Sequence, residues 1–182
     1  MRTCLTEPWE KWYTAPADLE VKPRSKLLNA IYYPVPNIKN ETFYKELEHL
    51  VEIGVLTPAQ QLQYGTPVFI IPKNQGTVRF ITDYRKLNQK IVRKPYPFPR
   101  IGVTMQQLEG FQYATALYVN IGYDNIELSP ESCNITTTVA EFGKFSYNRF
   151  RMGLCASSDT FQFKVDDLLW DIKGPRHIST IY

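Results

Sequence analysis

Two β-rich runs joined by a short turn constrain the fold of this chain more than any other feature. The first run, residues 66–73, reads TPVFIIPK, and the second, residues 77–83, reads TVRFITD, with Asn-Gln-Gly between them. β-Branched and aromatic residues on both sides of a glycine-containing turn predict an antiparallel hairpin. Alternation along the second run places Arg79 on one face and Phe80 on the opposite, apolar face.

A stretch that begins near Asn40 has the spacing of an amphipathic helix. Asn40 or Thr42 can cap its start, and Gly54 can adopt the left-handed conformation that ends a helix. Its apolar residues recur at i, i+4, i+7 and i+8, and they are Phe43, Leu47, Leu50 and Val51. The stripe predicts a helix that packs on a sheet.

A second helix is expected near residue 157. Ser157 or Ser158 can cap it, and Asp159 lies in the first turn, where the helix dipole favours a negative charge. The expected apolar stripe consists of Phe161, Val165, Leu168 and Leu169. Asp166 and Asp167 then form a charged outer face.

Between these elements the sequence predicts a connector and a second hairpin. Residues 94–100 (KPYPFPR) have proline at every second position, which favours an extended segment, and a short helix that ends at Gly110 follows it. Residues 135–139 and 145–149 are expected to be strands that flank a tight turn at 141–144.

The composition of the chain indicates a globular protein of a reducing compartment. With 43% hydrophobic residues, a chain of 182 residues can form one globular domain. Three cysteines without ligand-like spacing indicate a reducing compartment. The N-terminus lacks a signal-peptide core, and the longest apolar run, residues 68–71, is too short to span a bilayer. We therefore expect an intracellular protein of the cytoplasm or nucleus with no membrane partner.

Positive charge is concentrated in residues 73–100. This segment has Asp83 as its one carboxylate against eight basic residues, Lys73, Arg79, Arg85, Lys86, Lys90, Arg93, Lys94 and Arg100. Clustered lysine and arginine suit polyphosphate or a nucleic-acid backbone. The alternative is an ordinary solvated face.

Three segments together resemble a known family. The hairpin sequence continues to Asn88 as VRFITDYRKLN, residues 114–128 read ATALYVNIGYDNIEL, and residues 152–162 read MGLCASSDTFQ. Over residues 26–182 the chain resembles the reverse transcriptase, an RNA-directed DNA polymerase, of gypsy-type long-terminal-repeat retrotransposons. The resemblance implies an α+β fold, with right-hand polymerase fingers and a partial palm, in which antiparallel β hairpins pack on helices.

The resemblance also suggests how the chain is divided. Residues 1–36 would form an extended N-terminal arm, and residues 37–182 the fingers and an incomplete palm. Within the latter, the fingers are expected at 37–94 and 125–148, and the palm at 95–124 and 149–182. An incomplete palm would leave an exposed strand edge that is prone to non-specific self-association.

Family members use the matching residues to bind a nucleotide. Lys73 and Arg79 match the lysine and arginine that grip the incoming triphosphate, and Tyr123 matches the aromatic residue under the nucleotide sugar. The alternatives are ordinary exposed strand charge for Lys73 and Arg79, and a core tyrosine for Tyr123. By resemblance, the partners are an RNA or DNA template-primer and a dNTP.

The catalytic carboxylate of the family is missing. Tyr118 stands where the family has the aspartate that binds Mg²⁺, and a neutral phenol is a poor ligand for this cation. Asp124 and Glu127 lie beyond Gly122 in the chain, where their spacing would misplace a metal. We therefore expect no intact catalytic residue, and no protein site that binds Mg²⁺ well.

Two further differences from the family pattern also indicate that the chain is inactive. Arg151 replaces the proline of the family's Leu-Pro-X-Gly turn, and the sequence reaches Tyr182 without the Tyr-X-Asp-Asp hairpin. Three hypotheses remain: an active polymerase, an inactive retroelement fragment, and a remnant that binds nucleic acid or nucleotide through residues 73–100. The second is favoured.

Overall fold

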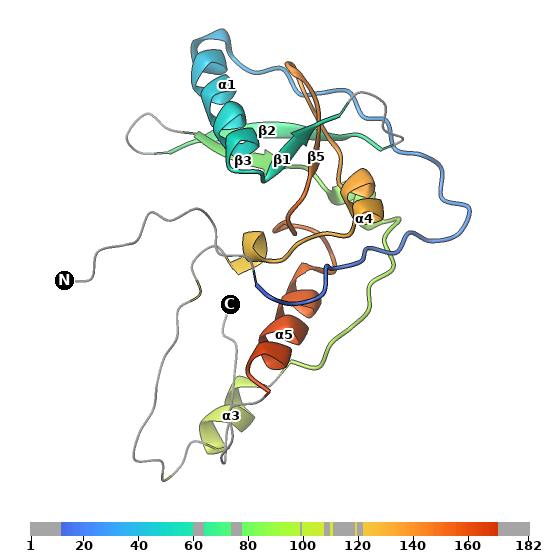
Figure 1. Ribbon diagram of the computed structural model, residues 1–182, viewed down its shortest axis with the longest axis vertical. Coiled ribbons are helices and arrows are strands. Elements are labelled where there is room, and N and C mark those ends of the chain that lie inside the picture. Colours follow the sequence, from blue (N-terminus) through green and yellow to red (C-terminus); the bar gives the residue numbers. More distant parts are fainter. Residues whose placement is uncertain are drawn as a thin grey trace, which may run out of the picture.

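The structure is a computed structural model that describes residues 12–59, 64–73, 78–98, 100–107, 110, 119 and 122–170. The sheet and helix α1 lie at one end of the molecule, and helix α5 lies toward the other end (Figure 1). Tyr118 and the end of the chain beyond Trp170 lie outside the described residues.

A five-stranded mixed sheet forms the upper part, with the order β1-β5-β4-β2-β3. Only β2 and β4 pair in parallel; the other neighbours among the described strands are antiparallel. The strands are β1 (Leu56–Pro58), β2 (Thr66–Pro72), β3 (Val78–Thr82), β4 (Thr138–Ala140) and β5 (Gly143–Tyr147). Both predicted hairpins, β2–β3 and β4–β5, are therefore confirmed.

Helix α1 (Asn37–Glu52) packs beside the sheet through its predicted stripe. Phe43 is 1% exposed, and its ring centroid lies 5.4 Å from that of Phe80 on β3. Gly54 has the expected left-handed φ of 72°. The predicted start was wrong: the helix begins earlier, after Pro36, whose carbonyl accepts a hydrogen bond from Lys39 N at 2.8 Å.

Of the shorter helices, only α3 was predicted from the sequence. They are α2 (Arg85–Asn88), α3 (Ile101–Gln107), α4 (Pro130–Ile135) and the 3₁₀ helix η2 (Gly122–Asn125). The strand expected from Ile135 is wrong at that residue, which instead closes α4. The Ser129 side chain caps α4 by accepting from Ser132 N, and Pro130 follows at the first position, where a helix tolerates proline.

Helix α5 (Ser157–Leu168) buries only part of the expected stripe, because Phe161 and Val165 pack in or against the core and Leu168 does not. Its N-cap is Ala156, without a side-chain cap, so neither Ser157 nor Ser158 has the predicted capping role. Leu168 is 41% exposed, while four polar residues of α5 lie in the interior: Ser157, Asp159, Gln162 and Lys164. Polar partners from distant segments explain this, because Lys164 Nζ donates to Ala15 O at 2.7 Å.

The N-terminal arm contains no helix and no paired strand over residues 12–36. It runs along the other elements through isolated bridges between Ala17 and Leu128 and between Val21 and Ile91. The domain boundaries remain a prediction. Within the described part of the chain, no helix combines the length and apolar character that crossing a membrane requires.

Candidate nucleotide site and its surroundings

The β2–β3 hairpin brings Lys73 and Arg79 together. Arg79 pairs with Ile71 across the hairpin, and Lys73 follows β2 two residues later, so strand alternation places both cations on one face. Both side chains are exposed. The geometry suits two positive charges that approach an anion together, and the triphosphate role remains a prediction.

Tyr123 lies on η2 and is half-buried against helix α5. Its ring centroid is 5.1 Å from that of Phe161, which also lies 5.5 Å from the ring of Trp12 in the arm. The contact is close because residue 122 is glycine: a Cβ there would lie 2.5 Å from the Phe161 ring. Tyr123 therefore packs against the core, and its contact with a nucleotide sugar remains a prediction.

Arg151 forms an ion pair beside η2. Its Nη1 lies 2.5 Å from Asp124 Oδ1, and its guanidinium carbon lies 4.8 Å above the ring centroid of Tyr147. Burial raises the pKa of Asp124, and the neighbouring guanidinium opposes that shift. Burial alone would lower the pKa of Arg151, but Tyr147 and Asp124 raise it above its usual value. Arg151 thus has a structural role that the missing proline could not supply.

Asp124 and Glu127, the two carboxylates considered above as substitute metal ligands, each lie beside an arginine. Asp124 is held by Arg151, and Glu127 Oε1 lies 3.5 Å from Arg149 Nη1. Throughout the described part of the chain, no three histidine, cysteine or acidic side chains are grouped so that they could hold a metal. Carboxylates that are neutralised by arginine do not fit the oxygen-rich site that Mg²⁺ requires. Tyr118 itself lies outside the described residues.

The Arg151 ion pair yields a stability prediction. Replacing Arg151 by methionine leaves the Asp124 carboxylate, which is 15% exposed, without its partner. We expect the free energy of unfolding to fall by about 1–2 kcal/mol, less than for a fully buried pair. Urea unfolding of Arg151→Met measures the loss, and adding Asp124→Asn should recover part of it. Equal stability of Arg151→Met and the parent chain would contradict the role given to this pair.

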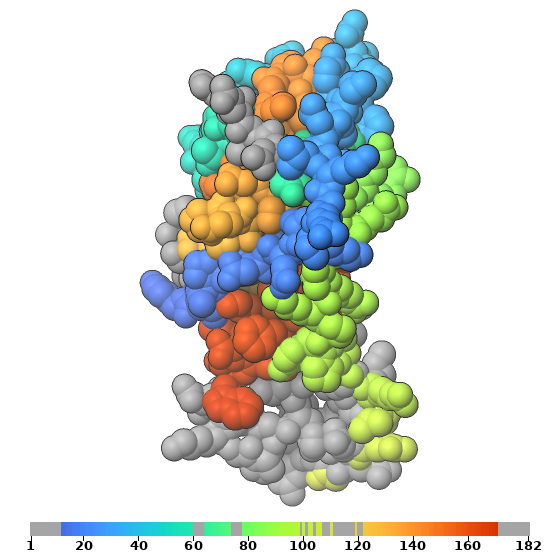
Figure 2. Space-filling model, turned by 90° about the vertical axis from the view of Figure 1, so that its right-hand side faces the viewer, coloured from blue at the N-terminus to red at the C-terminus, as the bar shows by residue number. Residues whose placement is uncertain are grey.

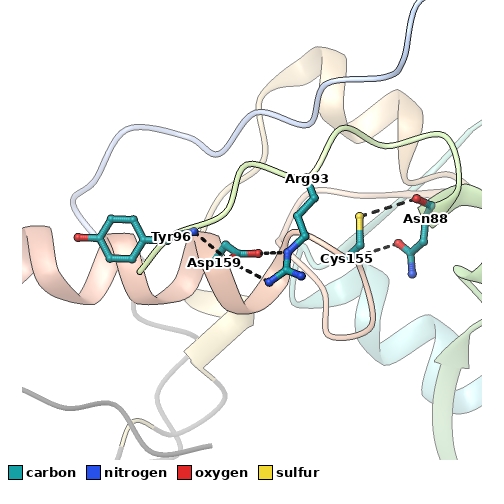
Figure 3. A network of polar contacts seen from close by, with 5 residues as sticks. All are labelled: Asn88, Arg93, Tyr96, Cys155 and Asp159. Carbon is teal, nitrogen blue, oxygen red and sulfur yellow. Dashed lines mark hydrogen bonds and ion pairs between the residues drawn. The ribbon is translucent and has the colours of Figure 1, made fainter. Parts of the chain in front are cut away.

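A polar network joins the segment after α2 to the start of α5 (Figure 3). Asp159 is 2% exposed, and its carboxylate accepts hydrogen bonds from Arg93 Nε at 2.7 Å and from the backbone N of Tyr96 at 2.9 Å. The Asn88 side chain donates to Gly153 O and accepts from Cys155 N. These hydrogen bonds hold residues 88–96 against the turn that contains Gly153 and Cys155 and against the first turn of α5.

Asp159 lies in the first turn of α5, as predicted, but its role in this network was not predicted. Arg93 and Asp159 are 66 residues apart, and no local pattern connects them. The one available signal was the surplus of basic residues before Arg100, which indicates that some of them pair with carboxylates elsewhere in the sequence.

Solved structures with the same arrangement define the class of fold. A foamy viral protease-reverse transcriptase in complex with double-stranded DNA matches with a TM-score of 0.70 and 20% identity, over 93% of this chain and 31% of that chain. The native prototype foamy virus protease-reverse transcriptase matches with a TM-score of 0.69 and 25% identity, over 82% and 20%. The predicted class, an α+β polymerase fold, is confirmed.

Curated relatives show which group of proteins the chain is similar to in sequence, although no protein-family model matches the chain. The Pol polyprotein of transposon opus from Drosophila melanogaster is 27% identical over 143 residues, which are 75% of this chain and 14% of the relative. That of transposon gypsy from the same fly is 28% identical over 144 residues, with the same shares. The chain is similar to retroelement Pol polyproteins and spans about one seventh of the length of these relatives.

Proposed function

We propose that this chain is a reverse transcriptase domain of the gypsy type that does not catalyse DNA synthesis. The observation that carries the inactivity is chemical: Tyr118 stands at the family's aspartate position, and the two carboxylates nearest after it, Asp124 and Glu127, are paired with arginines. A two-metal phosphoryl transfer needs free oxygen ligands held in fixed positions. We therefore expect removal of Mg²⁺ to leave the affinity of the protein residues at this site for their ligands unchanged.

We propose further that the domain binds a template-primer and a dNTP through the exposed cations of the β2–β3 hairpin. Support comes from the foamy viral reverse transcriptases, whose structures include complexes with double-stranded DNA and with an RNA/DNA hybrid. Lys73 and Arg79 present two positive charges on one face of the hairpin, as phosphate binding requires. Self-association through an edge strand and an intracellular location belong to the same proposal.

Primer extension and binding, measured on the same preparation, test this function. We expect an RNA/DNA template-primer to bind with an affinity that falls as salt rises, and no extension product with Mg²⁺ and dNTPs. Lys73→Gln with Arg79→Gln should weaken binding of both template-primer and dNTP by about tenfold, which corresponds to about 1.4 kcal/mol.

The control is the pair Lys39→Gln and Lys45→Gln on α1, which removes the same charge elsewhere. It should change the affinity by less than the hairpin pair does. A Mg²⁺-dependent extension product would overturn the inactivity, and equal losses from the two pairs would overturn the role of the hairpin.

A further inference from the structure

The first described part of the arm, residues 12–19, lies across η2, α4 and α5. Ala17 N donates to Glu127 O at 2.7 Å, and Ser129 N donates to Ala17 O at 3.1 Å. Figure 2 shows this part of the arm, in dark blue, between residues in yellow above it and α5, in red, below it. We call residues 12–19 the strap.

Side chains of the two helices also bind the strap. Lys164 on α5 is 5% exposed, and its Nζ donates to Ala15 O at 2.7 Å. Among the residues that the structure describes, no carboxylate pairs with this ammonium group. At the other end of the strap, Leu19 N donates to Ser132 Oγ on α4 at 2.7 Å. A buried ammonium group is costly unless polar atoms satisfy it, so the contact with Ala15 O fixes the strap on α5.

Trp12, at the start of the strap, contacts the ring that lies beside Tyr123. Trp12 N donates to Asn125 O at 3.1 Å, and its ring centroid lies 5.5 Å from that of Phe161. The ring centroid of Phe161 lies 5.1 Å from that of Tyr123. Phe161 therefore contacts both other rings, and the position of Trp12 is transmitted to Tyr123 through it.

The packing leaves Phe161 little freedom to move. Phe161 is 7% exposed, and a Cβ on residue 122 would lie 2.5 Å from its ring. In a close-packed interior a ring shifts only where a neighbouring side chain gives it space. Removal of the Trp12 ring would open such a space, because surrounding side chains relax partly into a cavity. Phe161, and with it Tyr123, would then move.

We propose that Trp12, held by the strap, is a positioning residue that fixes the Tyr123 ring through Phe161 and so sets the preference of the site for deoxyribose over ribose nucleotides. The inference rests on the proposed function and on the sugar contact predicted for Tyr123. The two kinds of nucleotide differ in the 2′-hydroxyl alone. A ring under the sugar distinguishes them only if it is held within about 0.5 Å of its working position.

Isothermal titration calorimetry of the full chain with dATP and with ATP tests this role. We expect the parent chain to bind dATP about tenfold more tightly than ATP, and Trp12→Ala to reduce this ratio to about threefold or less. Trp12→Phe keeps a ring against Phe161 and should restore most of the preference. Lys164→Met removes the donor to Ala15 O while leaving Trp12 in the chain, and it should lower the ratio in the same direction.

Tyr13→Ala is the matched control. Tyr13 is the next residue of the strap after Trp12, and it is 99% exposed. Its removal should leave the ratio of the two affinities unchanged. The urea midpoint of each variant shows whether it is folded under the conditions of the titration. If Trp12→Ala does not fold, the ratio measured for Lys164→Met decides.

The outcomes separate this inference from the proposed function. A lower ratio in Trp12→Ala, with recovery in Trp12→Phe, supports the positioning role. A ratio that stays at the parent value in folded Trp12→Ala overturns it, even if both affinities fall, since the residue would then be merely structural. Equal binding of dATP and ATP by the parent chain also overturns it and leaves dNTP binding by the hairpin standing. If the parent chain binds neither nucleotide, the proposed dNTP binding is wrong and the inference fails with it.

Discussion

Phe43→Ala is expected to lower the free energy of unfolding by about 4 kcal/mol, the loss typical of a phenylalanine removed from a core. Phe43 is 1% exposed on α1, and its ring centroid lies 5.4 Å from that of Phe80 and 5.5 Å from that of Phe142. It is thus the side chain that joins the helix to both hairpins of the sheet. Because the neighbouring rings belong to separate elements, the cavity cannot close through a small local shift.

Urea unfolding followed by far-UV circular dichroism measures this effect. Tyr44→Ala is the matched control, because Tyr44 is next in sequence, is 44% exposed and touches Phe142 only edge-on. Its effect on stability should be much smaller. Similar losses of stability from the two variants would mean that α1 does not depend on the buried stripe.

Asp159→Ala has the second largest expected effect, about 3 kcal/mol. The change removes a buried carboxylate that accepts hydrogen bonds from Arg93 and from the backbone N of Tyr96, and hydrogen bonds to charged groups are each worth about 1.5–3 kcal/mol. The Tyr96 N–H loses this acceptor, while Arg93, 57% exposed, regains water. The destabilisation should therefore stay below the sum of the separate hydrogen bonds.

Asp159 also makes the free energy of unfolding depend on pH, with less stability at acid pH. Hydrogen bonding to Arg93 and to the Tyr96 backbone lowers the pKa of Asp159, and Arg85 lowers the pKa of Asp83. A lowered folded-state pKa adds stability above the unfolded pKa of about 3.9, and this stability is lost as pH falls through the folded value. Asp124, whose pKa is raised, contributes with the opposite sign.

We therefore expect urea midpoints of the parent chain to fall between about pH 4 and pH 2, with a smaller fall in Asp159→Ala. Asp159→Asn separates charge from shape, because it keeps an acceptor for Tyr96 but loses the ion pair. It should unfold at an intermediate urea concentration at neutral pH. Identical acid profiles for the parent chain and Asp159→Ala would show that Asp159 does not titrate as a buried, paired carboxylate.

Sequence patterns predicted the elements whose signals are local. The β2–β3 hairpin follows from alternating β-formers around a glycine-containing turn, and the stripe of α1 follows from helical spacing. The start of α1 and the short helices α2, α4 and η2 were missed, because a proline cap and helices of four to six residues leave a weak periodic signal. The resemblance to reverse transcriptases implied the fold class, and the fold comparison confirmed it.

The sequence by itself determined the basic character of residues 73–100 and the presence of tyrosine at position 118, because both depend on residue identity alone, while the class of fold followed from the family resemblance. Only the tertiary structure decided which charges neutralise one another. It pairs Arg93 with Asp159 and Arg151 with Asp124, over separations of 66 and 27 residues. It also lays the arm beside the connector through backbone hydrogen bonds. Charge pairing depends on distances of a few ångströms in space, and a linear pattern contains no such information.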